Sequence, residues 1–372
     1  MATQQQNIGE VLQFFNEARR PVKSSDRVPG PFPYLGASGT VDYVEGFTHE
    51  GSYLCVSEDG ANLLTRSLPI AWVQDGKFWA NNHLQVLGGV SREHLTFFRY
   101  AIESTNIAAY VTGSAQPKLS KASLSSVKVP KFSRGEEERI GKLLSAIDDK
   151  TVANQTSISK IDEILRALWQ KELSLGSIDV PLSSLASFIN GKAFTKGASG
   201  TSRVVVRIAE MNSGIGSRTI YSDIDAAPDN VVDPGELLFS WSGTLMTKRW
   251  PYDQAIVNQH IFKAVPNGQL DLWALRQAID AQLEYFQMIA AGKATTMGHI
   301  KRGDLDQEVE VPAQMSEETN QLGNSLWRLA TSLEIQNLQL ARTRDELLPL
   351  LMSGRITVGE AEDAADEAAS ES

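Results

Sequence analysis

The chain has 372 residues, of which 42% are hydrophobic and 22% charged, and it carries a formal net charge of −10. A chain of this length is too long for one compact core, so we expect two or three domains. It has no run of about 18 apolar residues and no basic-then-apolar start, which argues against membrane insertion and secretion. The single cysteine, Cys55, excludes an internal disulfide, and we expect a cytoplasmic protein.

The negative charge is concentrated at the C-terminus. The last fourteen residues, GEAEDAADEAASES, hold six acids and no base, and without them 35 bases face 39 acids. We expect residues 357–372 to form a disordered acidic tail. The remaining chain is nearly neutral and can bind DNA wherever its bases cluster locally.

Residues 1–132 predict a first α+β domain. The stretch LTFFRYAIES at 95–104 has a helical period, and VKVP follows at 127–130. A longer helix then begins after Ser133, with glutamates in its first turn. This segment, 133–178, contains a helix expected over 136–172, roughly 55 Å long at about 1.5 Å per residue. Its heptad has a positions Leu144, Thr151, Ile158 and Leu165, and d positions Ile147, Asn154, Ile161 and Leu168.

Residues 179–315 predict a second α+β domain. The stretches SRVVVRIAEM, GELLFSWSG and IVNQHIFKAV have the content of strands, and DLWALRQAIDAQLEYFQMIA at 271–290 has a helical period. The segment 316–356 then predicts a second long helix. Its heptad has a positions Leu326, Leu333, Leu340 and Leu347, and d positions Leu329, Gln336, Thr343 and Leu350.

The two long helices are expected to form an antiparallel coiled coil. Both seams run for four heptads, and both carry a polar d residue near the middle, Asn154 and Gln336, which would meet in an antiparallel pair and fix the register. The alternative is an amphipathic helix that lies on its own domain. The fold class is therefore α+β, with two similar domains separated by the helices.

The chain repeats itself. Asn81 and His83 lie over Asn258 and His260 at a shift of 177; GSYLCVSEDG at 51–60 lies over GELLFSWSGT at 235–244 at 184; and VKVP lies over VEVP at 182. Because the order is kept while the spacers vary, we expect two copies of one domain with diverged loops.

Lysine and arginine residues collect in loops rich in glycine, serine and threonine, where backbone N–H groups and hydroxyls can approach phosphates. A solvated loop is the alternative for any one of them. Two similar basic modules at a fixed separation would hold two DNA segments. The predicted DNA-binding residues are Arg20, Lys23, Arg66, Lys118 and Lys121 in the first domain, and Lys192, Lys196, Ser240, Ser242, Thr244, Lys248, Arg249, Lys293 and Lys301 in the second.

We find no catalytic constellation. Nucleotide-binding glycine motifs, a serine nucleophile elbow and the Asn/Asp-Pro-Pro-Tyr/Phe motif of adenine methyltransferases are all missing from the sequence, and we expect no metal site. His83 and His260 lack a shared nucleophile and orienting acid. We expect the paired Asn-x-His segments to occupy the same strand in both copies, supporting the loops structurally, with DNA-backbone contact as the alternative.

The sequence resembles the specificity (S) subunits of Type I restriction–modification systems. The resemblance covers roughly residues 7–356. It is carried by the ordered segments FPYLGASGTVDYV, YLCVSEDGANLL and KFWANNHLQVL in the first half, by INGKAFTKG, GELLFSWSGT and VNQHIFKAV in the second, and by both long helices. Because VSEDG in the first domain stands where the second has SWSGT, we expect the two domains to recognise different half-sites.

The resemblance implies two target-recognition domains, each bound to one half of a split sequence in double-stranded DNA, with the helices setting the gap. It also implies two docked methyltransferase subunits and translocating restriction subunits, and no cofactor in this chain: S-adenosylmethionine belongs to the methyltransferase, and ATP and magnesium to the restriction subunit. The alternatives are a stand-alone DNA-binding regulator and a coiled-coil scaffold that binds proteins.

Overall fold

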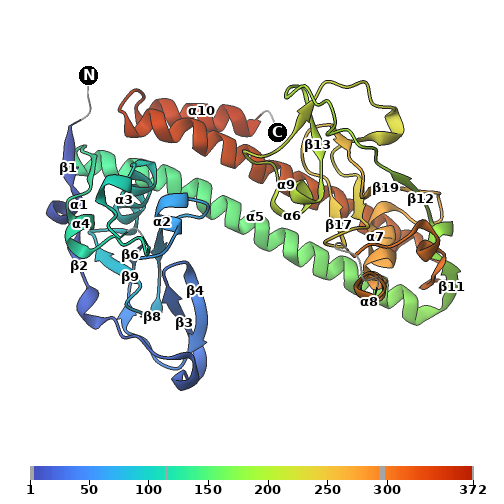
Figure 1. Cartoon of the computed structure of the whole chain (residues 1–372), viewed down its shortest axis with the longest axis horizontal. Coiled ribbons are helices and arrows are strands. Elements are labelled where there is room, and N and C mark those ends of the chain that lie inside the picture. Colours follow the sequence, from blue (N-terminus) through green and yellow to red (C-terminus); the bar gives the residue numbers. More distant parts are fainter. Residues whose placement is uncertain (1–3, 114, 293–297, 371–372) are drawn as a thin grey trace. The chain divides into compact units, whose positions relative to one another are not determined.

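The computed structural model describes residues 4–113, 115–292 and 298–370 (Figure 1). The chain divides into two compact units. Unit 1 comprises 1–151 and 339–372, and unit 2 comprises 152–338. Each unit therefore contains part of each long helix, because the side chains of both helices complete its core. This division differs from the sequence prediction, which treated the helices as segments separate from the recognition domains.

Unit 1 contains two four-stranded sheets and a two-stranded one. Their orders are β4-β3-β8-β5, β2-β9-β6-β7 and β1-β10. The strands are β1 Gln5–Asn7, β2 Gln13–Phe14, β3 Pro29–Gly36, β4 Gly39–Val44, β5 His49–Glu50, β6 Tyr53–Ser57, β7 Ala71–Gln74, β8 Lys77–Ala80, β9 Leu84–Gly88 and β10 Lys128–Pro130. The shorter helices are α1 Ile8–Val11, α2 Asn62–Thr65, α3 Arg92–Ser104 and α4 Lys121–Ser125.

Unit 2 repeats this topology. Its sheets have the orders β14-β13-β18-β15, β12-β19-β16-β17 and β11-β20. The strands are β11 Ser177–Pro181, β12 Ala186–Asn190, β13 Arg203–Val206, β14 Tyr221–Ser222, β15 Val231–Val232, β16 Leu237–Ser240, β17 Met246–Arg249, β18 Ala255–Val257, β19 Ile261–Pro266 and β20 Glu308–Pro312. The shorter helices are α6 Ile208–Ser213, α7 Leu272–Ala281 and α8 Leu283–Gly292.

The duplication is complete at the level of strands. Each strand of unit 1 has a counterpart in the same sheet position of unit 2: β1 corresponds to β11, β2 to β12, and so on to β10 and β20. Even the parallel pairing is repeated, because β3 pairs with β8 in parallel and β13 pairs with β18 in parallel, while the other pairs are antiparallel. The two copies of one α+β fold expected from the sequence are therefore present.

The strand register corrects the sequence alignment by one residue. Ser57 pairs with Leu84 at the end of β6, and Ser240 pairs with Ile261 at the end of β16. Ser57 and Ser240 are therefore equivalent, a shift of 183 and not 184. The one-residue change matters because neighbouring residues of a strand point to opposite faces. It makes Glu58 the counterpart of Trp241.

The helical segment expected at 271–290 is two helices. The helix is interrupted at Gln282, between α7 and α8. The break allows both helices to bury apolar side chains in the core of unit 2: Trp273 from α7, and Phe286 from α8, whose ring lies 6.0 Å from that of Phe239. A continuous helix would have carried one of these faces away from the sheet.

The long helices are α5 Arg134–Leu175 and α9 Glu317–Met352. In unit 1, Leu144 near the start of α5 shares a core with Leu351 at the end of α9. In unit 2, Leu165 towards the end of α5 shares a core with Trp327 near the start of α9. The helices therefore pair antiparallel. At the middle, Asn154 donates to Gln336 at 2.7 Å and to Asn337 at 2.9 Å.

The predicted seam residues differ in burial between the two helices. On α5 the six residues of the predicted pairing set are all buried: Leu144, Ile147, Asn154, Ile158, Ile161 and Leu165. On α9 Leu347 is buried, and Leu326, Leu333, Gln336 and Leu340 are partly buried. The prediction is wrong for Leu329, which is 49% exposed. Trp327 and Ala330 are buried instead, because the Trp327 ring turns this part of α9 towards the sheet and its indole N–H donates to the Gly235 carbonyl.

The expected disordered tail is a helix at α10, Val358–Ser370. Val358 and Ala361 lie in the core of unit 1, three residues apart and therefore on one side of the helix. The Thr357 hydroxyl accepts from the Glu360 N–H and caps the first turn. The prediction of disorder over these residues was wrong because it weighed the acids and overlooked this short apolar face.

Two glycines allow the long helices to approach the domains closely. A Cβ on Gly141 of α5 would lie 1.9 Å from the Glu93 carbonyl oxygen at the start of α3, and a Cβ on Gly323 of α9 would lie 2.3 Å from the Trp273 ring. These glycines occupy corresponding places in the two copies, eleven residues after the prolines of VKVP and VEVP.

We predict that Gly141→Ala destabilises unit 1 by about 1–3 kcal/mol, because the methyl group overpacks a backbone contact. Urea unfolding measures the loss. Gly135→Ala, on the same helix with nothing within 4 Å of its added Cβ, is the control and should not destabilise the protein. Equal stability of the two variants would contradict the close-packing argument.

Candidate nucleic-acid interface

The two Asn-x-His segments form turns and not strands, which corrects the sequence expectation. Residues 81–83 connect β8 to β9, and residues 258–260 connect β18 to β19. Asn81 Oδ1 accepts from the His83 N–H at 2.7 Å, and Asn258 Oδ1 accepts from the Phe194 N–H at 3.0 Å. His260 has a left-handed backbone, with φ of 75°. Asn81 therefore organises its own turn, and Asn258 ties the equivalent turn to the segment that follows β12.

Three segments meet beside each turn through equivalent backbone hydrogen bonds. In unit 1 the Glu58 N–H donates to the His83 carbonyl at 2.9 Å, and the Leu119 N–H donates to the Glu58 carbonyl at 2.7 Å. In unit 2 the Trp241 N–H donates to the His260 carbonyl at 3.0 Å, and the Ile300 N–H donates to the Trp241 carbonyl at 3.0 Å. The backbone framework is thus the same in both copies.

In unit 1 this framework carries charged side chains. The Glu58 carboxylate pairs with Arg19 at 2.6 Å and with Lys118 at 3.2 Å. Asp59 lies 2.8 Å from the Nδ1 of His83. The carboxylates are mostly covered, whereas the side chains of His83 and Lys118 are 48% and 52% exposed. The acids therefore hold two exposed hydrogen-bonding side chains in place.

In unit 2 the same framework carries aromatic side chains. The Trp241 ring lies 4.9 Å from that of His260 and 5.9 Å from that of Phe262. Its indole N–H donates to Asn190 Oδ1 at 2.8 Å, which fixes the plane of the ring. An open pocket of about 400 Å³ lies here, with an aromatic floor and a basic rim. It is lined by Asn190, Trp241, Phe262, His299, Ile300, Lys301 and Arg302.

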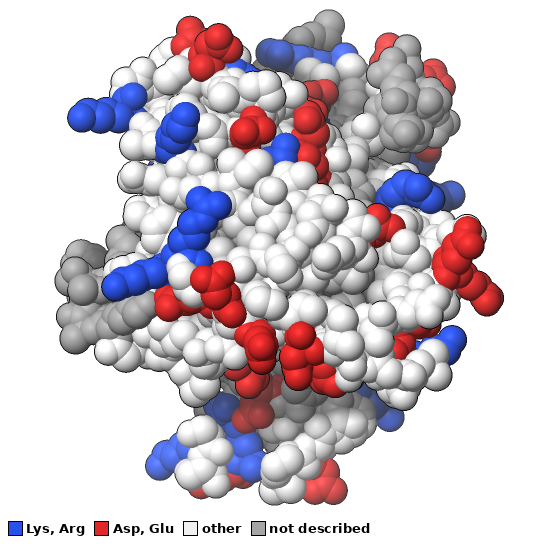
Figure 2. Space-filling view, turned by 90° about the vertical axis from the view of Figure 1, so that its right-hand side faces the viewer, with Lys and Arg blue, Asp and Glu red and all other residues white. Residues whose placement is uncertain are grey.

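Most predicted DNA-binding residues are exposed. This group comprises Arg20, Lys23, Lys118, Lys121, Lys192, Lys196, Thr244 and Lys301. Lys293 lies outside the described residues. On the face drawn in Figure 2, lysine and arginine side chains are interspersed with acids and with broad uncharged areas.

Several predicted contacts are corrected by burial. Ser240 and Ser242 are buried, and the Ser240 hydroxyl donates to the Thr244 carbonyl inside the β16–β17 turn. Arg66 donates to the carbonyl and the carboxylate of Glu103, each at 2.7 Å. The two serines are therefore covered within their own loop, and Arg66 is bound to α3.

Lys248 and Arg249 are also corrected. Lys248 is half-buried; its ammonium donates to the Met211 carbonyl at 2.7 Å, and burial lowers its pKa. The Arg249 side chain is 1% exposed and pairs with Glu334 of α9 at 2.8 Å and with Asp162 of α5 at 3.7 Å. The sequence showed two bases in a loop, but β17 turns them inward, where Arg249 fastens the sheet to both long helices.

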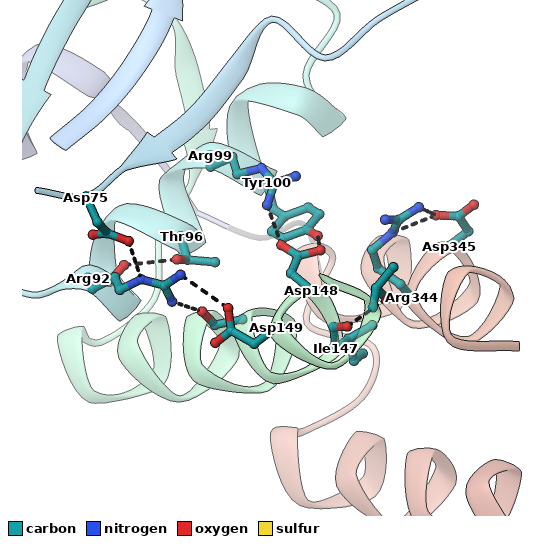
Figure 3. A network of polar contacts seen from close by, with 12 residues as sticks. Asp75, Arg92, Thr96, Arg99, Tyr100, Ile147, Asp148, Asp149, Arg344 and Asp345 are labelled. Carbon is teal, nitrogen blue, oxygen red and sulfur yellow. Dashed lines mark hydrogen bonds and ion pairs between the residues drawn. The ribbon is translucent and has the colours of Figure 1, made fainter. Parts of the chain in front are cut away.

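A related network fastens α3 to α5 in unit 1 (Figure 3). Arg92 pairs with Asp75 at 3.0 Å and with Asp149 at 3.3 Å. Arg99 pairs with Asp148, whose carboxylate also accepts from the Tyr100 hydroxyl at 2.7 Å. Burial raises the pKa of Tyr100. In each unit, arginines are thus bound to acids on α5.

Sequence reasoning missed the aromatic side chains nearest the turns. Trp241 and His299 were not among the predicted contacts, although Ser240, Ser242 and Thr244 around Trp241 were. The available signal for Trp241 was the contrast between VSEDG in the first half of the sequence and SWSGT in the second.

Cys55 is buried in the core, and burial raises the pKa of its thiol. Among the described residues no cluster of His, Cys, Asp and Glu is placed to bind a metal. No described helix is both long and apolar enough to cross a membrane.

Comparisons with known proteins agree with this architecture. A family model described as the type I restriction modification DNA specificity domain matches residues 3–163. A putative type I restriction enzyme specificity subunit from Haemophilus influenzae is 39% identical over 140 residues, which are 38% of this chain. The match spans about a third of that relative's length, 36%.

A solved structure has the same fold over nearly its full length. It is the S subunit of a Type-I restriction-modification system from M. genitalium, with a TM-score of 0.65 over 94% of this chain and 96% of that one. The sequence identity is 14%, so this likeness concerns the fold alone.

We predict that Arg249→Ala destabilises unit 2 by about 3 kcal/mol, because it leaves the Glu334 carboxylate without its partner at a largely buried position. The urea unfolding midpoint measures this. Arg328→Ala, on the exposed side of α9, is the control and should have little effect. If the Arg249 variant were as stable as the control and merely bound DNA less well, the assignment of Arg249 to the core would be wrong.

Proposed function

We propose that the chain is a specificity subunit of a type I restriction–modification system and supplies the DNA sequence recognition of such a complex. The matches of residues 3–163 to the DNA specificity domain and of 140 residues to a putative specificity subunit support this proposal. Each unit binds one half of a bipartite, gapped site in double-stranded DNA. The chain acts in the cytoplasm, without chemistry of its own.

The observation that carries the proposal is the complete duplication of the recognition fold. Two copies with the same strand order present the same corner, the Asn-x-His turn and its neighbouring segments, with different side chains. A protein with two like frameworks and unlike contact residues suits a DNA site of two unlike halves. A scaffold for protein binding would not need basic loops in both copies.

Catalysis belongs to partner subunits in this proposal. Two methyltransferase subunits bring S-adenosylmethionine, and restriction subunits bring ATP and magnesium. The long helices offer a docking surface for the methyltransferases, because the apolar side chains of Ile164, Leu322 and Leu329 are 45%, 46% and 49% exposed on α5 and α9. Exposed apolar groups on a regular helix are typical of a protein contact.

We predict that co-expression with the adjacent methyltransferase modifies adenines in a two-part, gapped motif, which sequencing of the methylated genome identifies. The stand-alone regulator predicts tight DNA binding without the methyltransferase. The protein scaffold predicts little DNA binding at any salt concentration, whereas DNA recognition predicts affinity that falls steeply with the logarithm of salt. Absence of a gapped motif would contradict the proposal.

The helices should set the gap between the half-sites. Inserting one heptad after Thr151 of α5 and one after Leu338 of α9 lengthens both helices at the boundary of the units and leaves the contacts within each unit intact. Seven helical residues add about 10 Å, or about three base pairs at ~3.4 Å each. We expect the methylated motif to keep both halves and to gain about three base pairs of gap.

The control inserts the heptad into α5 alone, which makes the two helical connections between the units unequal in length, so that the helices cannot keep their present pairing in both units at once. It should abolish methylation or reduce expression. An unchanged gap in the double insertion would show that the helices do not measure the spacing.

A further inference from the structure

One corner of the shared framework carries unlike side chains in the two units. The hydrogen bonds of this corner are equivalent, and the isolated bridges agree, since Asp59 pairs with Lys118 as Ser242 pairs with His299. The structure therefore fixes the residue equivalences: Glu58 with Trp241, and Lys118 with His299. The backbone is held constant while the chemistry of the side chains changes from charged to aromatic.

In unit 1 the corner presents hydrogen-bond donors. Lys118 has three N–H donors, of which the pairing with Glu58 takes one. Asp59 lies 2.8 Å from the Nδ1 of His83 and orients the ring, which is 48% exposed beside Lys118. The Lys118 ammonium suits the acceptor edges of bases and phosphate oxygens, and such contacts weaken as salt is raised.

In unit 2 the corner presents an aromatic surface. Trp241 is held by a hydrogen bond at its indole nitrogen and by the rings of His260 and Phe262 against it. Lys301 and Arg302 are exposed and line the same pocket. An aromatic surface beside two cations suits the methyl group of a thymine in the major groove and a neighbouring phosphate.

The corner is also where side chains can differ without disturbing the fold. The strands beneath it are buried: β6 and β9 in unit 1, and β16 and β19 in unit 2. The segments that meet here are loop residues just beyond the strand ends, anchored by their own backbone groups. Loops on a rigid scaffold are the usual place for binding residues.

We propose that each unit recognises its half-site at this corner, unit 1 with the Lys118 ammonium and the exposed His83 ring beside it, and unit 2 with the aromatic pocket around Trp241. This inference rests on the proposed function and assigns the recognition to particular side chains. It also states how the halves differ physically: contact with unit 1 is mainly electrostatic, and contact with unit 2 is mainly apolar.

The test uses the full chain purified with its methyltransferase. The probe is a labelled duplex carrying the motif that the wild-type complex methylates, together with two duplexes in which one half or the other is scrambled. Fluorescence anisotropy over a series of KCl concentrations gives the affinity and its salt dependence for the wild type, Trp241→Ala and Lys118→Ala. Matched controls are Tyr285→Ala, an exposed aromatic on α8, and Lys128→Ala, an exposed lysine on β10.

Trp241→Ala should weaken binding to the intact duplex at least about fivefold with little change in salt slope, because loss of the contacts at one base pair costs about 1–3 kcal/mol. Lys118→Ala should lower the salt slope by about one. Each variant should cease to distinguish the intact duplex from one scrambled duplex, and the two variants should lose different halves. Trp241→Phe and Lys118→Arg should retain most of the wild-type behaviour, as should both controls.

The outcomes distinguish a failure of the proposed function from a failure of the assignment of recognition to this corner. If the wild-type complex methylates no gapped motif, the proposed function fails and this inference fails with it. If the motif exists but both variants bind and discriminate like the wild type, the function stands and the inference is overturned. Should Trp241→Ala fold poorly, Arg302→Ala tests the same pocket from its exposed rim and should lower the salt slope by about one; an unchanged slope would count against the pocket.

Discussion

Each recognition unit completes its hydrophobic core with side chains from both long helices, and the rest of the structure depends on this sharing. Ile140 of α5 and Leu347 of α9 belong to the core of unit 1, and Ile161 of α5 and Ala330 of α9 belong to that of unit 2. A long helix gains most of its stability from packing one face and little from intrinsic propensity. The helices are therefore structural parts of both domains, and each domain is held to them by packing and by ion pairs.

The duplication separates what must stay constant from what can vary. Buried strands, the turns that begin at Asn81 and Asn258, and the backbone bonds around Glu58 and Trp241 are common to both copies. These features satisfy backbone groups that would be costly to leave unpaired. Side chains just beyond the strand ends do not pair these backbone groups and can therefore differ: the same corner holds an ion-pair cluster in one copy and packed aromatic rings in the other.

The sequence predicted the large features and missed those that depend on tertiary packing. The repeat, the α+β class, the antiparallel helix pair and the Asn154–Gln336 contact follow from periodicity and order, which one sequence displays. Whether a lysine or arginine side chain points outward does not follow from periodicity and order. Arg249 and Lys192 both stand in polar loops of the sequence, yet one is buried between two helices and the other is exposed. The α9 seam was misplaced at Leu329 because heptad counting has no knowledge of Trp327 packing on the sheet, and α10 was missed because two apolar residues are a weak signal among many acids.

The β16–β17 hairpin joins the two aspects of unit 2. Trp241 follows β16 at one end of the hairpin, and Arg249 at the other end pairs across the strands with Leu237 and reaches Glu334 and Asp162 on the long helices. A buried arginine bound to two carboxylates tolerates little displacement, because any movement leaves a charge uncompensated. The ring that floors the pocket and the ion pair that fixes the domain therefore belong to one rigid element. Precise recognition of DNA requires such a connection, since a side chain can discriminate bases only if the backbone that carries it is held to the rest of the molecule.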